Sequence, residues 1–307
     1  HMLCELFSYY KRDEHSMDTE KSRILLKIIE TGSFSRAAEL LGYTPSGINR
    51  MVKSMEEETG FPLFTRSQKG VCLTTEGKRL LPIFRELVHW QKQLDQLCAD
   101  ICGLETGHLT IGTYYSTAAC WLPQIIQTYQ SSWPGIQIDL CEGGNSDLTK
   151  KLESRQLDCC FFSEYHGQCD WLPLRQDELV AWLPKDHPLA NAAQFPLEAL
   201  NDIPFIQPLP EQNTDLERLL STHHLTPNVR FTTSDNYTAY SMVSAGLGMS
   251  LNNALMARSW NGPVAILPFD PPQYITLGIA LPSLAQASPA LKKFIGCAKS
   301  VIASLHP

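Results

Sequence analysis

Four polar residues between positions 46 and 53 have the types and spacing needed to bind nucleic acid. They are Ser46, Asn49, Arg50 and Lys53. On a helix they would share one face, because residues three and four apart are neighbours. Hydroxyl and amide groups can read base edges in a major groove, and cations can bind phosphate. The alternative is an ordinary helical unit whose polar face contacts only solvent.

The flanking segments predict the elements that would position this face. Ser33 can cap a helix that ends at Gly42, and Thr44 can cap the next helix, which begins at Pro45. Apolar residues recur along that second helix at Ile48, Met51, Val52 and Met55. Residues 64–66 and 71–73 flank a turn at 67–70, which predicts a two-stranded wing. The expected DNA contacts are Ser33, Arg36, Thr44, Ser46, Asn49, Arg50, Lys53, Arg66 and Lys69.

This segment closely resembles the DNA-binding domain of LysR-type transcriptional regulators. Residues 32–41 match the family's G-S-F-x-x-A-A-x-x-L run, and residues 73–77 match L-T-x-x-G. Residues 55–66 match L-E-x-x-L-G-x-x-L-F-x-R except at Met55 and Thr59. The match covers roughly a fifth of the chain and is specific in order and spacing. Met55 replaces the usual Leu, and residues 44–49 replace the commoner S-Q-P-A-V-S. Since the second departure changes the base-facing side chains, a relative's operator sequence does not transfer.

The charge of the chain is unevenly distributed. The 307 residues have a net charge of −7 and are 43% hydrophobic, enough apolar residues for two or three cores. Residues 17–79 contain ten basic and eight acidic side chains, a balance of +2, so the remainder is −9. An acidic body weakens non-specific attraction to phosphate. Binding should therefore depend on specific contacts and on dimerisation.

A long helix is predicted from Thr74, as its N-cap, to about Cys102. Seven of its residues follow a 4-3-4-3 spacing, which is typical of a coiled-coil seam; they are Leu80, Phe84, Leu87, Gln91, Leu94, Cys98 and Ile101. Pro82 should kink this helix or remove one of its hydrogen bonds. We expect Leu80, Phe84, Leu87, Leu94 and Ile101 to form a homodimer interface, and LysR-type proteins dimerise through a helix in this position. A two-fold dimer implies a pseudo-palindromic double-stranded DNA operator. The resemblance further implies a dimer of dimers, and we consider RNA polymerase as a partner.

Strands and helices alternate beyond a short hinge at residues 103–107. Expected strands at 109–113, 136–141 and 159–162 alternate with helices at 118–130 and 146–154. A second run has strands at 205–206, 229–232, 248–251 and 264–267 with helices at 214–221 and 237–245, followed by a strand at 275–281 and a helix at 290–304. This alternation predicts doubly wound α/β lobes with mostly parallel strands. The arrangement resembles the family's effector domain, which is similar to periplasmic solute-binding proteins.

The predicted fold is therefore an α+β multidomain protein. It comprises a winged helix-turn-helix at 17–74, a linker helix at 75–104 and a two-lobed α/β effector domain at 105–307. Lobe I would cover 108–178 and 270–307, and lobe II would cover 179–269. Residues 1–16 lack periodicity, and we expect them to be a disordered extension that begins with a cloning remnant.

A small-molecule effector would bind where strand ends and helix starts converge between the lobes. Simple helix capping is an equal alternative for each Ser or Thr. Residues 233–235 are expected on a crossover between the lobes. The candidate contacts are Thr113, Tyr114, Tyr115, Ser116, Thr117, Gly144, Asn145, Ser163, Gln207, Ser234 and Asp235.

Other classes of function lack supporting motifs. Nucleotide-binding glycine loops, a G-x-S-x-G nucleophile and a carboxylate pair beside a base are all absent, so we expect neither an enzyme, catalytic residues nor a cofactor. The ten cysteines lack zinc spacing, and no metal site is expected. A thiol-based redox regulator on the same scaffold stays open, with Cys98, Cys102 and Cys169 as candidate sensors. No signal peptide or membrane span is apparent, so we expect a cytoplasmic protein.

Overall fold

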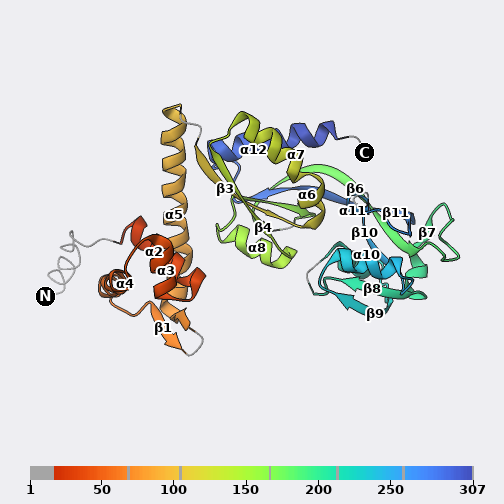
Figure 1. The fold of residues 1–307 in the computed structure, drawn as a ribbon, viewed down its shortest axis with the longest axis horizontal. Coiled ribbons are helices and arrows are strands. Elements are labelled where there is room, and N and C mark those ends of the chain that lie inside the picture. The colour runs from red at the N-terminus through yellow and green to blue at the C-terminus, as the bar shows by residue number, and fades with distance from the viewer. Residues whose placement is uncertain are drawn as a thin grey trace. The chain divides into compact units, whose positions relative to one another are not determined.

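The computed structural model describes residues 17–67, 70–103, 106–165, 167–211, 214–257 and 260–305. Residues 1–16, which we expect to be disordered, lie outside the described residues. The chain divides into two compact units, residues 1–95 and 96–307, and helix α5 extends across the division (Figure 1). Each unit is described by itself. Within the described residues, no helix is both long enough and apolar enough to cross a bilayer.

The first unit contains a three-helix core with a small wing. The elements are α2 (Thr19–Thr31), α3 (Phe34–Leu41), α4 (Pro45–Thr59), β1 (Phe64–Ser67) and β2 (Gly70–Leu73). Ser33 and Thr44 cap α3 and α4 as predicted, and Gly42 ends α3 with a φ of 72°. Ile28, Ala38 and Ile48 have no exposed surface and join the three helices in one apolar core. This geometry confirms the predicted winged helix-turn-helix.

Hydrogen bonds fix the start of the wing to α4. The Glu56 carboxylate accepts from the backbone N–H groups of Leu63 (2.7 Å) and Phe64 (3.1 Å). The Thr74 N–H donates to the Leu63 carbonyl at 2.9 Å. These bonds attach the beginning of the wing to α4 and to the start of α5.

Helix α5 (Thr75–Ile101) continues as one helix through Pro82, whose missing N–H removes one hydrogen bond of the helix. Thr74 caps it as predicted, accepting from the Gly77 N–H at 2.9 Å. The predicted dimer seam is wrong at its beginning, because Phe84 is only 3% exposed and Leu80 also packs against the core of the first unit. The large apolar residues that remain exposed follow a shifted 4-3-4-3-4 spacing. They are Ile83, Leu87, Trp90, Leu94, Leu97 and Ile101.

The second unit is built on a seven-stranded sheet with the order β10-β6-β11-β5-β3-β4, plus β7 beside β11. The strands are β3 (Gly107–Thr113), β4 (Ile136–Glu142), β5 (Cys159–Ser163), β6 (Asp170–Pro184), β7 (Phe195–Pro196), β10 (Ser250–Asn253) and β11 (Val264–Leu281). β3 pairs parallel with both β4 and β5, and β7 pairs parallel with β11. β6 pairs antiparallel with both β10 and β11, and β5 pairs antiparallel with β11. The expectation of mostly parallel strands is therefore met only in part, because the sheet is mixed. The chain returns through β11 beside β6, which makes those pairings antiparallel.

Helices cover both faces of the lobe I strands. α7 (Leu122–Ser132) and α12 (Pro289–Ser304) lie on one face, and α8 (Asn145–Glu153) lies on the other (Figure 1). The single helix expected at 118–130 is instead α6 (Tyr115–Cys120) followed by α7. Pro123 at the start of α7 accounts for the break, because it lacks an N–H and its ring crowds the preceding turn.

Lobe II contains the parallel pair β8 (Pro204–Pro208) and β9 (Asn228–Thr233). Around this pair lie α9 (Asp215–Thr222), α10 (Asn236–Ser244), α11 (Ala254–Ala257) and a short 3-10 helix (Leu197–Asn201). The connections between the lobes are the long strands β6 and β11, which run through the predicted lobe boundaries. Residues 233–235 end β9 and cap α10. They are therefore not on a crossover, contrary to expectation.

Candidate functional site

The exposed face of α4 is the candidate nucleic-acid interface. Ser46, Asn49, Arg50 and Lys53 are all exposed. On the opposite side, Ile48 and Met55 are fully buried and Val52 is 5% exposed. The two-sided character that the sequence predicted is thus present, with the polar side open to an approaching duplex.

Local contacts arrange the start of this face. The Thr44 hydroxyl accepts from the Gly47 N–H at 3.1 Å and lies 3.2 Å from the Ser46 hydroxyl. The Asn49 amide donates to the Pro45 carbonyl at 2.8 Å, which holds the side chain along the first turn. Further along, the Lys53 ammonium lies 3.7 Å from the Glu57 carboxylate, and both side chains are largely exposed. Such an exposed pair is weak, so the ammonium can exchange it for a phosphate.

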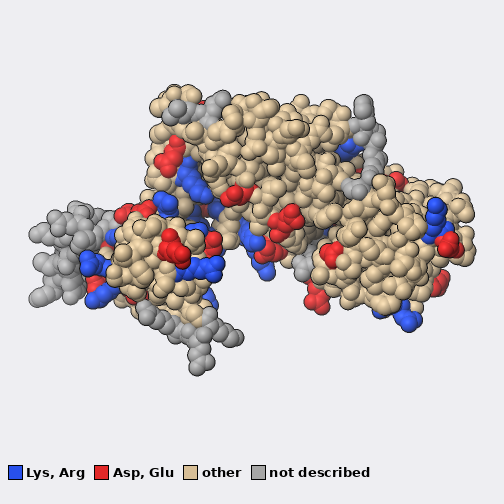
Figure 2. All heavy atoms as spheres, in the orientation of Figure 1, with Lys and Arg blue, Asp and Glu red and all other residues tan. Residues whose placement is uncertain are grey.

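The other predicted DNA contacts differ in position. Ser33 caps α3 through the Arg36 N–H at 3.4 Å, and the Arg36 side chain is exposed. Lys69 and the side chain of Arg66 lie outside the described residues. In the view of Figure 2, Lys and Arg side chains of the first unit lie beside Asp and Glu rather than forming one continuous basic surface. This mixture agrees with the small net charge of residues 17–79.

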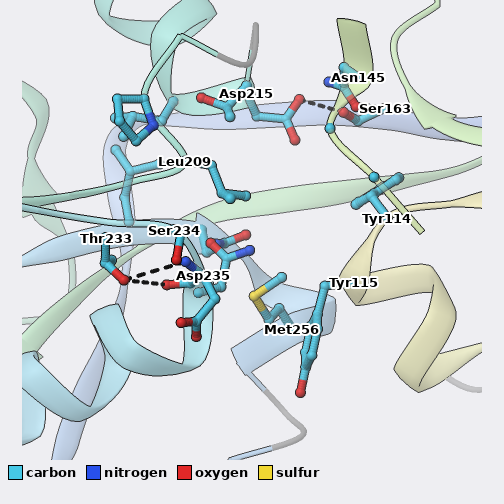
Figure 3. Close-up of a pocket in the computed structure, with 18 of the residues that line it drawn as sticks. Tyr114, Tyr115, Asn145, Ser163, Leu209, Asp215, Thr233, Ser234, Asp235 and Met256 are labelled. Carbon is cyan, nitrogen blue, oxygen red and sulfur yellow. Dashed lines mark hydrogen bonds between the residues drawn. The ribbon is translucent and has the colours of Figure 1, made fainter. Parts of the chain in front are cut away.

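A cavity of about 770 Å³ in the second unit is the candidate effector site. It lies where β4, β5 and β9 end and where α8, α9 and α10 begin, so both lobes supply its walls (Figure 3). This volume lies within the usual range for small-molecule sites. Seven of the residues predicted from the sequence line it. They are Tyr114, Tyr115, Gly144, Asn145, Ser163, Ser234 and Asp235.

Four predicted effector contacts do not line this cavity. Thr113, Ser116 and Thr117 have no exposed surface. The Thr113 and Thr117 hydroxyls bond each other at 2.8 Å, and the Asn253 amide of lobe II donates to the Ser116 hydroxyl at 3.3 Å. These hydroxyls serve the packing beneath the cavity, so we correct their assignment. Gln207, on β8, is also absent from the lining.

The sequence interpretation missed a contact between the lobes in this cavity. The Ser163 hydroxyl, at the end of β5, donates to the Asp215 carboxylate of α9 at 2.7 Å. Arg218 pairs with the same carboxylate and donates to the Ser163 carbonyl (3.1 Å) and hydroxyl (3.2 Å). Burial raises the pKa of Asp215, and the Arg218 charge opposes that rise. Thr214 as an N-cap after β8 was the available signal, because it marks a helix start at a strand end.

Tyr114 contributes a second buried polar group to the lining. Its hydroxyl has no well-aligned hydrogen-bond partner among the described residues. Burial, followed by the nearby Asp215 charge, raises the pKa of this phenol well above its ordinary value. The hydroxyl therefore stays protonated at neutral pH and can both donate and accept a hydrogen bond.

Comparisons with known proteins identify both units. Residues 19–78 match the bacterial regulatory helix-turn-helix family of lysR type, and residues 103–303 match the LysR substrate binding domain. The chain belongs to the LysR family of bacterial transcriptional regulators. It is 28% identical over 288 residues to the HTH-type regulator YvbU of Bacillus subtilis, covering 93% of this chain and 99% of YvbU. The family profiles confirm the resemblance that the head motifs predicted.

Solved structures of LysR-type regulators share the fold. A full-length OxyR variant from Pseudomonas aeruginosa aligns with a TM-score of 0.75 at 22% identity, covering 95% of this chain and 96% of that one. The regulatory domain of CcmR from Synechocystis, solved in complex with 2-PG, aligns with a TM-score of 0.60 at 22% identity, covering 65% of this chain and 99% of CcmR. At these identities the likeness concerns the fold alone.

Some thiols of this LysR-type regulator are buried, and others are exposed. Burial raises the pKa of Cys159 and Cys160, and it also raises that of Cys169. A reactive cysteine needs its thiolate form, so these three residues are poor sensors. Cys98 and Cys102 are exposed on α5. Among the described residues, no group of three or more His, Cys, Asp or Glu side chains could hold a metal ion.

Proposed function

We propose that α4 reads an operator in the major groove through Ser46 and Asn49, while Arg50 and Lys53 bind phosphate. Ser33, Arg36, Thr44 and the wing residues Arg66 and Lys69 would add contacts to the DNA backbone. The observation that supports this assignment is the exposed polar face of α4 opposite three buried apolar residues. Because the bacterial chromosome is in the cytoplasm, a DNA-binding role places the protein there. We propose no catalytic role.

We further propose that two chains dimerise through α5. The support is the row of six exposed apolar residues from Ile83 to Ile101 at coiled-coil spacing. Such a row in water favours self-association, because covering it removes apolar surface from solvent. Two recognition helices per dimer would then bind a pseudo-palindromic operator. By analogy with the family, we also propose that two dimers pair and that the protein contacts RNA polymerase.

The cavity between the lobes is our proposed effector site. Its lining comes from both lobes, so a ligand that contacts both can favour a closed arrangement over an open one. A ligand changes this equilibrium only through a difference in affinity for the two states. The relative CcmR, solved with 2-PG, is consistent with a small-molecule ligand in this part of the fold.

The experiment is a comparison of three variants on DNA from the region upstream of the gene. Footprinting locates the operator, and fluorescence anisotropy then measures affinity at several salt concentrations. Lys53→Ala should weaken binding to all sequences and lower the salt slope by about one unit, as expected for one lost phosphate contact. Asn49→Ala should cost about 1–3 kcal/mol on the operator and much less on random DNA. Lys150→Ala, at an exposed site in α8, is the control for charge.

Two results would contradict this assignment. An equal loss for Asn49→Ala on operator and random DNA would remove its base-reading role. An unchanged salt slope for Lys53→Ala, or the same change for Lys150→Ala, would show that α4 does not contact phosphate.

A further inference from the structure

The charged residues that line the effector cavity all have the same sign. They are Glu142, Asp215 and Asp235. Among the lining residues that the structure describes, there is no Lys, Arg or His. The nearby Arg218 is held by Asp215 and by both oxygens of Ser163. An anionic ligand would therefore meet carboxylates without meeting a cation that is available to it.

The three carboxylates come from both sides of the cavity. Glu142 ends β4 in lobe I, whereas Asp215 and Asp235 lie at the starts of α9 and α10 in lobe II. Arg218 already compensates the charge of Asp215, so the like charges that face each other across the cavity are those of Glu142 and Asp235. Like charges that approach across a cavity repel each other, and the repulsion grows as water is excluded. Closure of the lobes is thus opposed by this charge unless a cation enters with the ligand.

Acidic side chains offset the positive ends of the three helices that begin at this cavity. The start of α8 has no side-chain cap, but Glu142 lies just before it and Asp147 lies in its first turn, so two carboxylates stand at that helix end. The start of α9 is closed by a capping box between Thr214 and Glu217. The start of α10 is capped by Asp235, which accepts from the Thr238 N–H at 2.7 Å and from the Thr238 hydroxyl at 2.6 Å. The partial positive charges of these three helices are therefore already compensated by the protein's own side chains.

The remaining lining suits the apolar part of an organic cation. Tyr115 is 40% exposed, and its ring lies 5.5 Å from the ring of Trp260. Figure 3 shows Tyr115 beside Met256, below Tyr114. An aromatic face can bind an ammonium group. The buried Tyr114 hydroxyl, which has no well-aligned partner, offers an oxygen as an additional acceptor.

We propose that the effector is an organic ammonium compound with an apolar or aromatic portion. Its cation would lie between Glu142 and Asp235, and its apolar portion would lie against Tyr115 and Met256. By neutralising carboxylates of both lobes at once, it would favour closure. This inference rests on the proposed function of the cavity and adds the charge class of its ligand.

The test compares matched probes on the full-length protein by isothermal titration calorimetry. Phenethylamine and 3-phenylpropionate present similar apolar groups with opposite charges, and 2-phosphoglycolate adds a small dianion. We expect phenethylamine to bind, more tightly at low salt, and the two anions not to bind. Glu142→Gln and Asp235→Asn should each weaken phenethylamine about two- to fivefold, as expected for partly solvated ion pairs. The asparagine keeps the ability to cap α10, and Glu198→Gln, an exposed acid outside the cavity, should change nothing.

The outcomes separate this inference from the proposed function. Binding of either anion, with loss of that binding in a variant of the cavity, would overturn the ammonium assignment and leave the effector cavity in place. Phenethylamine binding that is unchanged by both acid substitutions would also overturn it. Failure of all three probes to bind at roughly 10 mM, a concentration above the weak-binding range, would overturn the ammonium assignment. The operator measurements would still test the DNA-binding role independently.

Discussion

Gly77→Ala should destabilise the first unit, although Ala normally stabilises a helix. Gly77 lies in the first turn of α5, where a Cβ would be 2.5 Å from the Leu63 carbonyl oxygen and 3.0 Å from a Leu73 methyl carbon. The Leu63 carbonyl accepts from the Thr74 N–H, so moving it would disturb both the cap of α5 and the start of the wing. Overpacking of this kind costs roughly 1–3 kcal/mol.

Helix propensity offsets about 1 kcal/mol of that cost. The closest atom belongs to the backbone, which moves less easily than the end of a side chain. We therefore expect the free energy of unfolding to fall by about 1–2 kcal/mol in total. In a domain of this size the loss corresponds to roughly 4–16 °C in melting temperature. Gly296→Ala is the matched control, because Gly296 is within α12 with no atom near its would-be Cβ. It should instead stabilise the second unit by about 0.5–1 kcal/mol.

Differential scanning calorimetry would measure both variants, and hydrogen exchange by mass spectrometry would assign each change to residues 17–95 or 96–305. A rise in the stability of the first unit on Gly77→Ala, like the rise expected for the second unit on Gly296→Ala, would contradict this prediction. That result would mean that the Leu63 backbone moves without cost.

Three further predictions follow from the packing. Leu94→Glu should convert the dimer to a monomer in light scattering because it places a charge in the exposed row, whereas Lys92→Glu, exposed beside that row, should not. Glu56→Ala should lower the stability of the first unit by about 2 kcal/mol, since two wing N–H groups lose their acceptor; an unchanged melting curve would show that water replaces it. Cys159 and Cys160 should resist iodoacetamide at mildly alkaline pH in the folded protein, because burial raises the pKa of both thiols and keeps them protonated. Labelling of either residue before the exposed Cys72 would contradict this prediction.

The DNA-binding head was predictable from sequence because its signals are local. Ser33 and Thr44 cap helices that begin within a few residues of them, and Gly42 needs only a positive φ. The predicted α5 seam is exposed at Leu87, Leu94 and Ile101, but not at its beginning. Heptad spacing fits two overlapping rows on this helix, and the core of the first unit covers Phe84 and packs against Leu80. Which row stays exposed depends on packing between distant segments.

The effector cavity shows the same division between local and distant causes. The rule that ligands bind where strands end pointed to the region in which the structure has a cavity. It could not separate Tyr115, which is exposed there, from Ser116, which is fully buried. The difference comes from Asn253, which covers Ser116 from a segment more than a hundred residues away. The same rule could have predicted Asp215, because this residue begins the helix that follows β8. Its pairing with Ser163 was not, because that contact forms only when the two lobes are brought together. Contacts of this kind, between segments of different lobes, are recorded by no local pattern.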